Sequence, residues 1–244
     1  MKQRDTFKPL SYWDRYIAYQ LETRLPKFEA KAWADDTAPK HRRRLLYSIF
    51  RERLQLLIAR YSRGDGLSVL RAEFPTVVQA LVDYHAQPDH EPYDFDYFDG
   101  YVRALGLVAL GILLETDDGT FARLLHEINQ SGRDALFDRL VALRQDNASS
   151  MTVLMYPRPY RPLYAAPDAS TTVRPTLLAD FVQQYYPAMK GVYWHNTHRR
   201  DDVGFFGYWC FELAAFVHEL EWDDEACLPS PYYPRAWRAD RGTL

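Results

Sequence analysis

The chain has 244 residues, of which 47% are hydrophobic and 15% aromatic, enough apolar material for one large folded domain or two small fused ones. This composition excludes a disordered tail. The formal net charge of −3 lacks the basic excess that is typical of a nucleic-acid-binding domain.

Apolar spacing predicts helices through the first half of the chain. Ser11 is a suitable N-cap for a first helix, which Pro26 should end or kink. A second helix is expected from Pro39 to about Tyr61, with Gly64 as its C-terminal stop. Further helices are expected at about 68–84, from the alternating segment 93–99 into the apolar run 105–114, at 119–129 and at 133–145.

Five prolines between Met151 and Pro175 mark the clearest change of composition, and we interpret this segment as a connection between two lobes. Helices should follow at about 177–189, 193–199 and 204–220, and the tail from Pro229 should pack as irregular coil. The prediction is an all-α protein, a compact multi-helix bundle of two fused helical lobes. We place these lobes at residues 1–128 and 129–244, with no substantial sheet.

Cysteine count and hydropathy indicate where the protein works. Two cysteines, Cys210 and Cys227, provide no disulfide framework and suit a reducing cytoplasm. The polar first nine residues lack a signal-peptide pattern, and the apolar run 105–114 is shorter than the roughly 20 residues that cross a bilayer. We therefore expect a cytoplasmic protein with no membrane partner.

Charge is unevenly distributed along the chain. Residues 40–71 include nine basic and two acidic side chains, whereas residues 83–118 include one basic and nine acidic ones. Residues 201–225 hold eight acidic side chains and no lysine or arginine. Solvated helix faces explain any single block, but two acidic blocks in one chain indicate a basic partner.

The chain shows no phosphate-binding loop, dinucleotide fingerprint, GxSxG elbow or HExxH motif. One alternative is a metal-dependent all-α hydrolase, in which His195 and His198 share a helix face and Asp201 or Asp202 completes the site. Because HxxH is common by chance, we expect no metal, no cofactor and no catalytic residue. A nucleic-acid binder that uses the basic segment 40–71 is a third reading, which a gel shift with duplex DNA tests; we expect no shift and no nucleic-acid partner.

The sequence Gly-Tyr-Trp-Cys-Phe-Glu-Leu-Ala-Ala at 207–215 encloses Glu212 with aromatic and small residues. A buried carboxylate costs several kcal/mol unless partners satisfy it, so the fold must require this residue. Glu212 could serve as a general base, because burial beside Tyr208, Trp209 and Phe211 would raise its pKa. With no nucleophile or second acid beside it, we favour a structural glutamate held by a tyrosine hydroxyl, an arginine or an indole.

This motif, the acidic pair after it and the closing Tyr-Tyr-Pro resemble the C-terminal domain of PoNi-type immunity proteins, antidotes to the PoNe DNase toxins of bacterial polymorphic toxin systems. The N-terminal half resembles the companion PoNi domain more loosely, through Arg4-Asp5, an aromatic first helix and the apolar run 105–114. At Arg235 the chain departs from the family, which often continues with an acidic residue. The matching C-terminal positions are Trp194, Gly207, Tyr208, Trp209, Phe211, Glu212, Ala214, Ala215, Asp223, Asp224, Tyr233 and Pro234.

The resemblance implies a non-catalytic all-α protein that binds a cognate DNase toxin, of the kind delivered by type VI or other contact-dependent secretion. It implies that the motif residues define the fold. A DNase must present a basic cleft to DNA, so an antidote that offers carboxylates can block that cleft and capture the enzyme quickly. The candidate contact residues are Asp94, Asp96, Asp99, Asp117, Asp118, Asp201, Asp202, Asp223 and Asp224, with Tyr97, Tyr93 or Phe98 as aromatic anchors.

Overall fold

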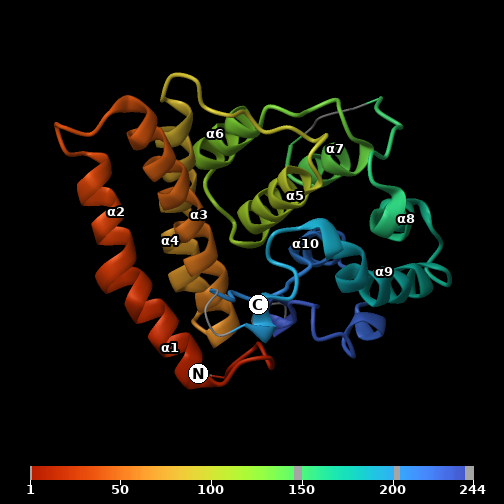
Figure 1. Ribbon diagram of the computed structural model, residues 1–244. Coiled ribbons are helices and arrows are strands. Elements are labelled where there is room, and N and C mark those ends of the chain that lie inside the picture. Colours follow the sequence, from red (N-terminus) through yellow and green to blue (C-terminus); the bar gives the residue numbers. More distant parts are fainter. Residues whose placement is uncertain (1, 146–149, 201–203, 240–244) are drawn as a thin grey trace. The chain divides into compact units, whose positions relative to one another are not determined.

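The computed structural model describes residues 2–145, 150–200 and 204–239 (Figure 1). Within these ranges every regular element is helical and there is no strand, which confirms the predicted all-α class. The chain forms two compact units, each assembled from segments that are distant in sequence. Unit 1 comprises Met1–Pro92, Thr116–Glu127 and Asn196–Gly207, and unit 2 comprises Tyr93–Glu115, Ile128–His195 and Tyr208–Leu244.

The centre of unit 1 is a helical hairpin of α3 (Pro39–Arg63) and α4 (Leu67–His85), which lie side by side in Figure 1. Helix α3 begins with a proline and ends at Gly64, as predicted. Gly64 has a φ of 109°, and a Cβ placed there would lie 2.3 Å from the carbonyl oxygen of Lys2. Glycine is therefore required at this end of α3 both for backbone conformation and for space.

The first helical stretch packs against α3 and does not stop at its proline. It consists of α1 (Leu10–Tyr19), the π-helical turn η1 (Gln20–Arg24) and α2 (Leu25–Ala32), so the chain stays helical through Pro26. Proline cannot donate the i→i−4 hydrogen bond, and the π turn has already left that pattern before it. Of the two predicted effects of Pro26, an end or a kink, the end was wrong, because the chain stays helical from Leu25 to Ala32.

A buried polar contact joins this helical stretch to α3. The Gln20 amide donates to Glu52 at 2.7 Å, and the Arg24 guanidinium lies 2.8 Å from the same carboxylate. Helix α6 (Asp118–Ile128), of which residues up to Glu127 belong to unit 1, supplies a carboxylate to His85 on α4 at 2.7 Å. These contacts link segments of unit 1 that are distant in sequence.

Unit 2 is organised around α5 (Phe98–Leu113), which is entirely buried from Leu107 to its C-terminal end. Helix α10 (Phe211–Glu219) packs on α5, and the indole of Trp237 in α11 (Ala236–Ala239) donates to the Leu113 carbonyl at 2.7 Å. The other helices of this unit are α7 (Ala135–Ala142), α8 (Pro157–Ala165) and α9 (Arg174–Ala188), with 3₁₀ turns η2 (Ala166–Asp168), η3 (Met189–Gly191) and η5 (Glu225–Cys227).

Three sequence-based expectations in the second half are corrected. The proline-rich segment contains α8 and lies wholly within unit 2, so it does not connect the two units. The helix expected at 193–199 is interrupted at Asn196, which has a φ of 67°, and leaves the 3₁₀ turn η4 (Thr197–Arg199) in unit 1. The helix expected at 204–220 begins at Phe211. No described helix combines the length and apolar character needed to cross a bilayer.

Candidate functional site

Three of the predicted contact acids lie where the chain enters α5, in residues 94–99, which we call the acidic turn. The carboxylate of Asp94 accepts the backbone N–H of Asp96 at 2.9 Å, an Asx turn that shapes the segment. The Arg133 guanidinium lies 3.5 Å from Asp94 and 3.2 Å from Asp96, so one arginine holds both carboxylates. The side chain of Asp96 is nevertheless 68% exposed.

Asp99 is held more tightly than the other two acids of the turn. It lies in the first turn of α5, where a carboxylate is favoured by the helix dipole, and Arg103 binds it at 2.8 Å one turn later. Its other oxygen accepts the backbone N–H of Tyr193 at 3.0 Å. Arg133 and Arg103 together offset two of the three carboxylate charges, and because Arg133 lies outside residues 83–118, the local negative charge is smaller than the count for that block by one.

The three proposed aromatic anchors of the acidic turn differ in exposure. Tyr97 is 70% exposed, whereas Tyr93 is buried. Phe98 is half-buried, with its ring 4.8 Å from that of Tyr156. Among these three residues Tyr97 therefore has the side chain that a partner can reach, and Tyr93 and Phe98 contribute to packing in unit 2.

Asp117 and Asp118 are exposed at the start of α6 in unit 1. Asp117 accepts the backbone N–H of Thr120 at 2.9 Å, an N-cap contact, and the bonds from Thr120 lower the pKa of this carboxyl. Asp201 and Asp202 lie outside the described residues. Asp117 therefore has a structural role in addition to any contact with a partner.

The pair Asp223–Asp224 divides into an exposed and a buried member. Asp223 is exposed and accepts the backbone N–H of Glu225 at 2.9 Å. Asp224 is 2% exposed and bonds to the Tyr233 hydroxyl at 2.8 Å and to Arg238 at 3.0 Å. The Asp224 carboxylate ties the closing segment to the end of α10, and it is not available to a partner in this structure.

The first part of the Gly-Tyr-Trp motif has no regular secondary structure and leads into α10. Gly207 has a φ of 116°, which explains glycine at this position. Tyr208 is buried with its ring 5.2 Å from that of Trp194, and the carbonyl of Trp209 accepts the Tyr185 hydroxyl at 3.0 Å. Pro234 and Tyr233 are buried beside this motif in unit 2, consistent with a role of the motif residues in packing.

Glu212 is fully enclosed in the first turn of α10, with 3% exposure. Burial raises its pKa to about 7, although its own backbone N–H and the nearby Tyr160 hydroxyl partly oppose the shift. Neither Glu212 Oε1 nor the Tyr160 hydroxyl forms a hydrogen bond of good geometry within the described residues. The surrounding groups are tyrosines and the Cys210 thiol, whose pKa burial also raises. This enclosure favours a structural role over a general base.

The two histidines of the alternative hydrolase do not share a helix face, because the backbone turns at Asn196. The His195 ring stacks on Tyr186 with centroids 4.5 Å apart, and the His198 ring lies 5.1 Å from that of Phe7. In the ranges that the structure describes, no group of three His, Cys, Asp or Glu side chains is arranged to hold a metal ion.

The arginines of the basic segment 40–71 make contacts within unit 1. Arg42 donates to the backbone carbonyl of the last residue of α2 at 2.9 Å and to that of Ala34 at 3.1 Å. Arg60 and Arg63 bind carboxylates at 3.3 and 2.7 Å. These bonds give the segment a structural role in unit 1.

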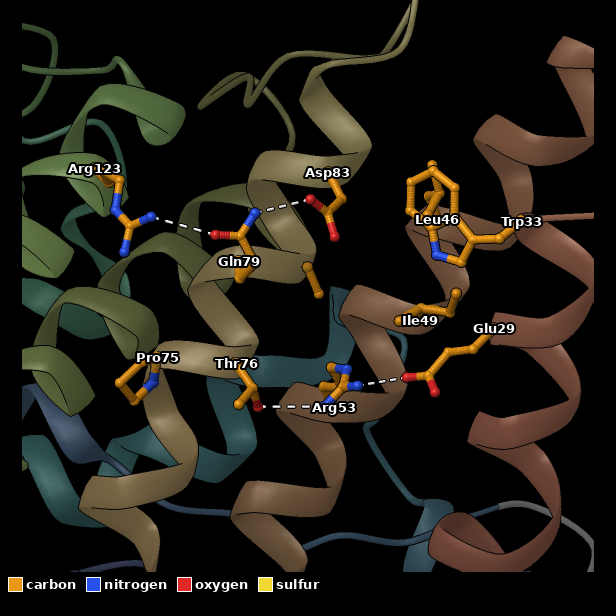
Figure 2. Close-up of a pocket in the computed structure, with 11 residues that line it drawn as sticks. Glu29, Trp33, Leu46, Ile49, Arg53, Pro75, Thr76, Gln79, Asp83 and Arg123 are labelled. Atoms are coloured by element: carbon orange, nitrogen blue, oxygen red, sulfur yellow. Dashed lines mark hydrogen bonds and ion pairs between the residues drawn. The ribbon is translucent and has the colours of Figure 1, made fainter.

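Unit 1 contains a groove that was not predicted from the sequence. It has a volume of about 500 Å³ and is open to solvent. Figure 2 draws the side chains that line it. Its lining comes from α2 and its C-cap, α3, α4 and α6, and the Trp33 side chain on its rim is 58% exposed. The detectable signal in sequence was a tryptophan followed by the polar segment Ala-Asp-Asp. The lining residues are Glu29, Trp33, Leu46, Ile49, Arg53, Pro75, Thr76, Gln79, Ala80, Asp83 and Arg123.

Comparison with known proteins agrees with this architecture. The crystal structure of protein PA2201 from Pseudomonas aeruginosa matches with a TM-score of 0.71 and 22% identity, covering 98% of this chain and 92% of that chain. At that identity the likeness shows a shared fold alone. No curated protein matches the chain.

Two family models match consecutive parts of the chain. The model for the N-terminal part of PoNe immunity proteins (PoNi) matches residues 4–126, and the model for their C-terminal part matches residues 132–237. The second match contains the Gly-Tyr-Trp motif, the buried Glu212 and the Asp224–Tyr233 contact. The chain therefore belongs to the PoNe immunity protein (PoNi) family, and its role is that of an immunity protein.

Proposed function

We propose that this protein binds a cognate DNase toxin of a bacterial polymorphic toxin system and neutralises it by covering its basic active-site region. Membership of the PoNe immunity family is the observation that carries the proposal, because it implies a toxin protein as the partner. The protein acts as a stoichiometric inhibitor and catalyses no reaction. It works in the cytoplasm, where a toxin delivered by type VI or another contact-dependent secretion system meets chromosomal DNA.

The acidic turn supports electrostatic capture of such a toxin. Asp96 and Tyr97 are the most exposed of its predicted contact residues, at 68% of the Asp96 side chain and 70% of Tyr97. An exposed tyrosine beside carboxylates combines an apolar anchor with a polar rim, as in many protein interfaces. Arg133 fixes Asp94 and Asp96 in place, so fewer side-chain rotamers are lost when a partner binds.

Burial and structural hydrogen bonds reduce the number of acidic residues that we propose as toxin contacts. Asp224 is left out because it is buried and holds Tyr233 and Arg238. Asp99 is a poor position for charge reversal, because its loss would disturb contacts with Arg103 and the Tyr193 backbone. The exposed acids Asp117, Asp118 and Asp223 remain secondary candidates, as do Asp201 and Asp202.

The test measures binding of the double variant Asp96→Lys, Tyr97→Ala to a catalytically inactive form of the cognate toxin. We expect at least a tenfold increase in Kd, about 1.4 kcal/mol, at roughly 0.15 M salt, with a thermal melt like that of the parent chain. The control Glu22→Lys changes charge at an exposed position of unit 1 and should bind as the parent does.

Two outcomes distinguish a wrong contact site from a wrong function. If the double variant binds with an unchanged Kd, the acidic turn is not part of the interface. If the parent chain neither binds the toxin nor suppresses its cleavage of plasmid DNA at equimolar concentration, the proposed function is rejected.

A further inference from the structure

The groove of unit 1 runs along α3, with α2 on one side and α4 on the other (Figure 2). Leu46, Ile49 and Arg53 of α3 form its floor at i, i+3 and i+7, which is one face of a helix. These positions span about 11 Å at 1.5 Å per residue, or two helical turns. Leu46 and Ile49 are themselves buried, so Trp33 supplies most of the reachable apolar surface.

The two ends of the groove differ in charge. At the lower end in Figure 2, Arg53 forms an ion pair with Glu29 and donates to the Thr76 hydroxyl at 3.3 Å, so its charge is compensated. At the upper end, Trp33 and Asp83 stand on opposite sides of the floor. Two charged lining residues, Asp83 and Arg123, lie at that end in Figure 2, with Gln79 between them and Asp83 on the side toward Trp33.

Asp83 keeps an open acceptor toward the groove. The Gln79 amide donates to its Oδ1 at 2.8 Å, and the Gln79 oxygen in turn accepts from Arg123 at 3.2 Å. This chain of bonds orients the Asp83 carboxylate without neutralising it, because neither Asp83 nor Arg123 makes an ion pair within the described part of the chain. A carboxylate has about four acceptor sites, and Gln79 takes one of them.

An exposed indole facing an uncompensated carboxylate is a suitable receptor for a cationic side chain. A guanidinium stacks on tryptophan through a cation–π contact and binds a carboxylate through paired N–H donors. We propose that this groove receives an arginine or lysine from a surface segment of the cognate toxin, and that this side chain stacks on Trp33 and pairs with Asp83. This inference rests on the proposed function. In this arrangement the cation of the toxin is complementary to the single carboxylate of Asp83. The groove is then a second region of toxin contact, besides the acidic turn.

The experiment measures binding of the intact chain to the inactive toxin by calorimetry, at two salt concentrations. Trp33→Ala should raise the Kd at least tenfold, as loss of an interface tryptophan does. Asp83→Asn keeps an oxygen for Gln79 and should raise the Kd severalfold while flattening the salt dependence. The matched control is Tyr19→Ala, which removes a 51% exposed aromatic of α1 that does not line the groove. A thermal melt of each variant checks the fold.

The two substitutions should also be coupled, because one cation contacts both groups. The double variant Trp33→Ala, Asp83→Asn should lose less binding energy than the two single variants added together. Additive losses would mean that Trp33 and Asp83 contact different parts of the toxin, and they would overturn the shared-cation arrangement.

Other outcomes reject the groove without ambiguity. Parent-like binding by Trp33→Ala overturns this inference and leaves the proposed function intact, whereas failure of the parent chain to bind overturns both. If light scattering shows that the chain alone forms a dimer and that Trp33→Ala dissociates it, the groove is a self-interface and the toxin assignment is wrong.

Discussion

The substitution Glu212→Gln tests whether the aromatic surroundings of this residue keep its carboxyl protonated. Burial raises the pKa of Glu212 from 4.5 to about 7. Since the folded pKa lies above the unfolded one, the folded state holds the proton more firmly between these values. The free energy of unfolding should therefore fall as the pH rises through this window, and the penalty should be complete above pH 7.

The size of the effect follows from the shift. The difference between 7 and 4.5, at 1.36 kcal/mol per pKa unit, is about 3 kcal/mol in total, and about 2.5 kcal/mol of it falls between pH 5 and pH 8. Glutamine has nearly the same shape and cannot ionise. The stability of Glu212→Gln relative to the parent should therefore improve by about 2.5 kcal/mol from pH 5 to pH 8, whatever the pH-independent cost of the amide.

Urea unfolding of both proteins at pH 5, 6, 7 and 8 measures this difference directly. Subtracting the two profiles cancels other titrating groups such as Asp5, whose pKa burial raises to about 6. The control Glu22→Gln, at an exposed position, should give a profile parallel to that of the parent. Parallel profiles for Glu212→Gln would refute the reasoning, because they would show that the carboxyl ionises in the folded state as it does in water.

Three further substitutions are tested by urea unfolding, one of them a control. Gly64→Ala should lower the free energy of unfolding by about 2 kcal/mol or more, because φ is 109° there and the new Cβ would meet the Lys2 carbonyl oxygen. Gly106→Ala, on a helix with no atom within 4 Å of the new Cβ, should instead stabilise by about 0.5–1 kcal/mol, and equal effects at the two glycines would contradict the reasoning. Tyr233→Phe should cost about 2 kcal/mol, because it removes a buried hydrogen bond to the Asp224 carboxylate, and a cost near zero would mean that Asp224 is protonated or hydrated.

Local rules were sufficient for the central hairpin of unit 1. A proline at the start and a glycine after the last turn predicted α3 to within two residues, because both signals act on the backbone next to them. The all-α class was predicted from the spacing of apolar residues along the chain. The continuation through Pro26 was not predictable in this way, since nothing in the residues alone marks the π turn that precedes it.

Long-range packing decided the features that the sequence left open. The Gly-Tyr-Trp segment looked helical by composition, but a positive φ at Gly207 starts α10 later, at Phe211. The groove could not be found because its lining comes from four helices, and no window of sequence contains it. The burial of Glu212, in contrast, was expected from its aromatic and small neighbours in sequence, and the residue is 3% exposed, while its structural role stays a prediction.

The acidic residues show why a charge count along the chain is a poor guide to an interface. Asp96 and Asp224 contribute equally to such a count, yet the first is 68% exposed at its side chain and the second is 2% exposed with two structural partners. A carboxylate attracts a basic partner only through the charge that its neighbours leave uncompensated and the surface that it exposes. By that criterion Asp96 in unit 2, through its exposure, and Asp83 in unit 1, which makes no ion pair within the described residues, matter more than the longer acidic blocks around them. Charge reversal at these two positions should therefore reduce toxin binding more than reversal at the exposed Glu22.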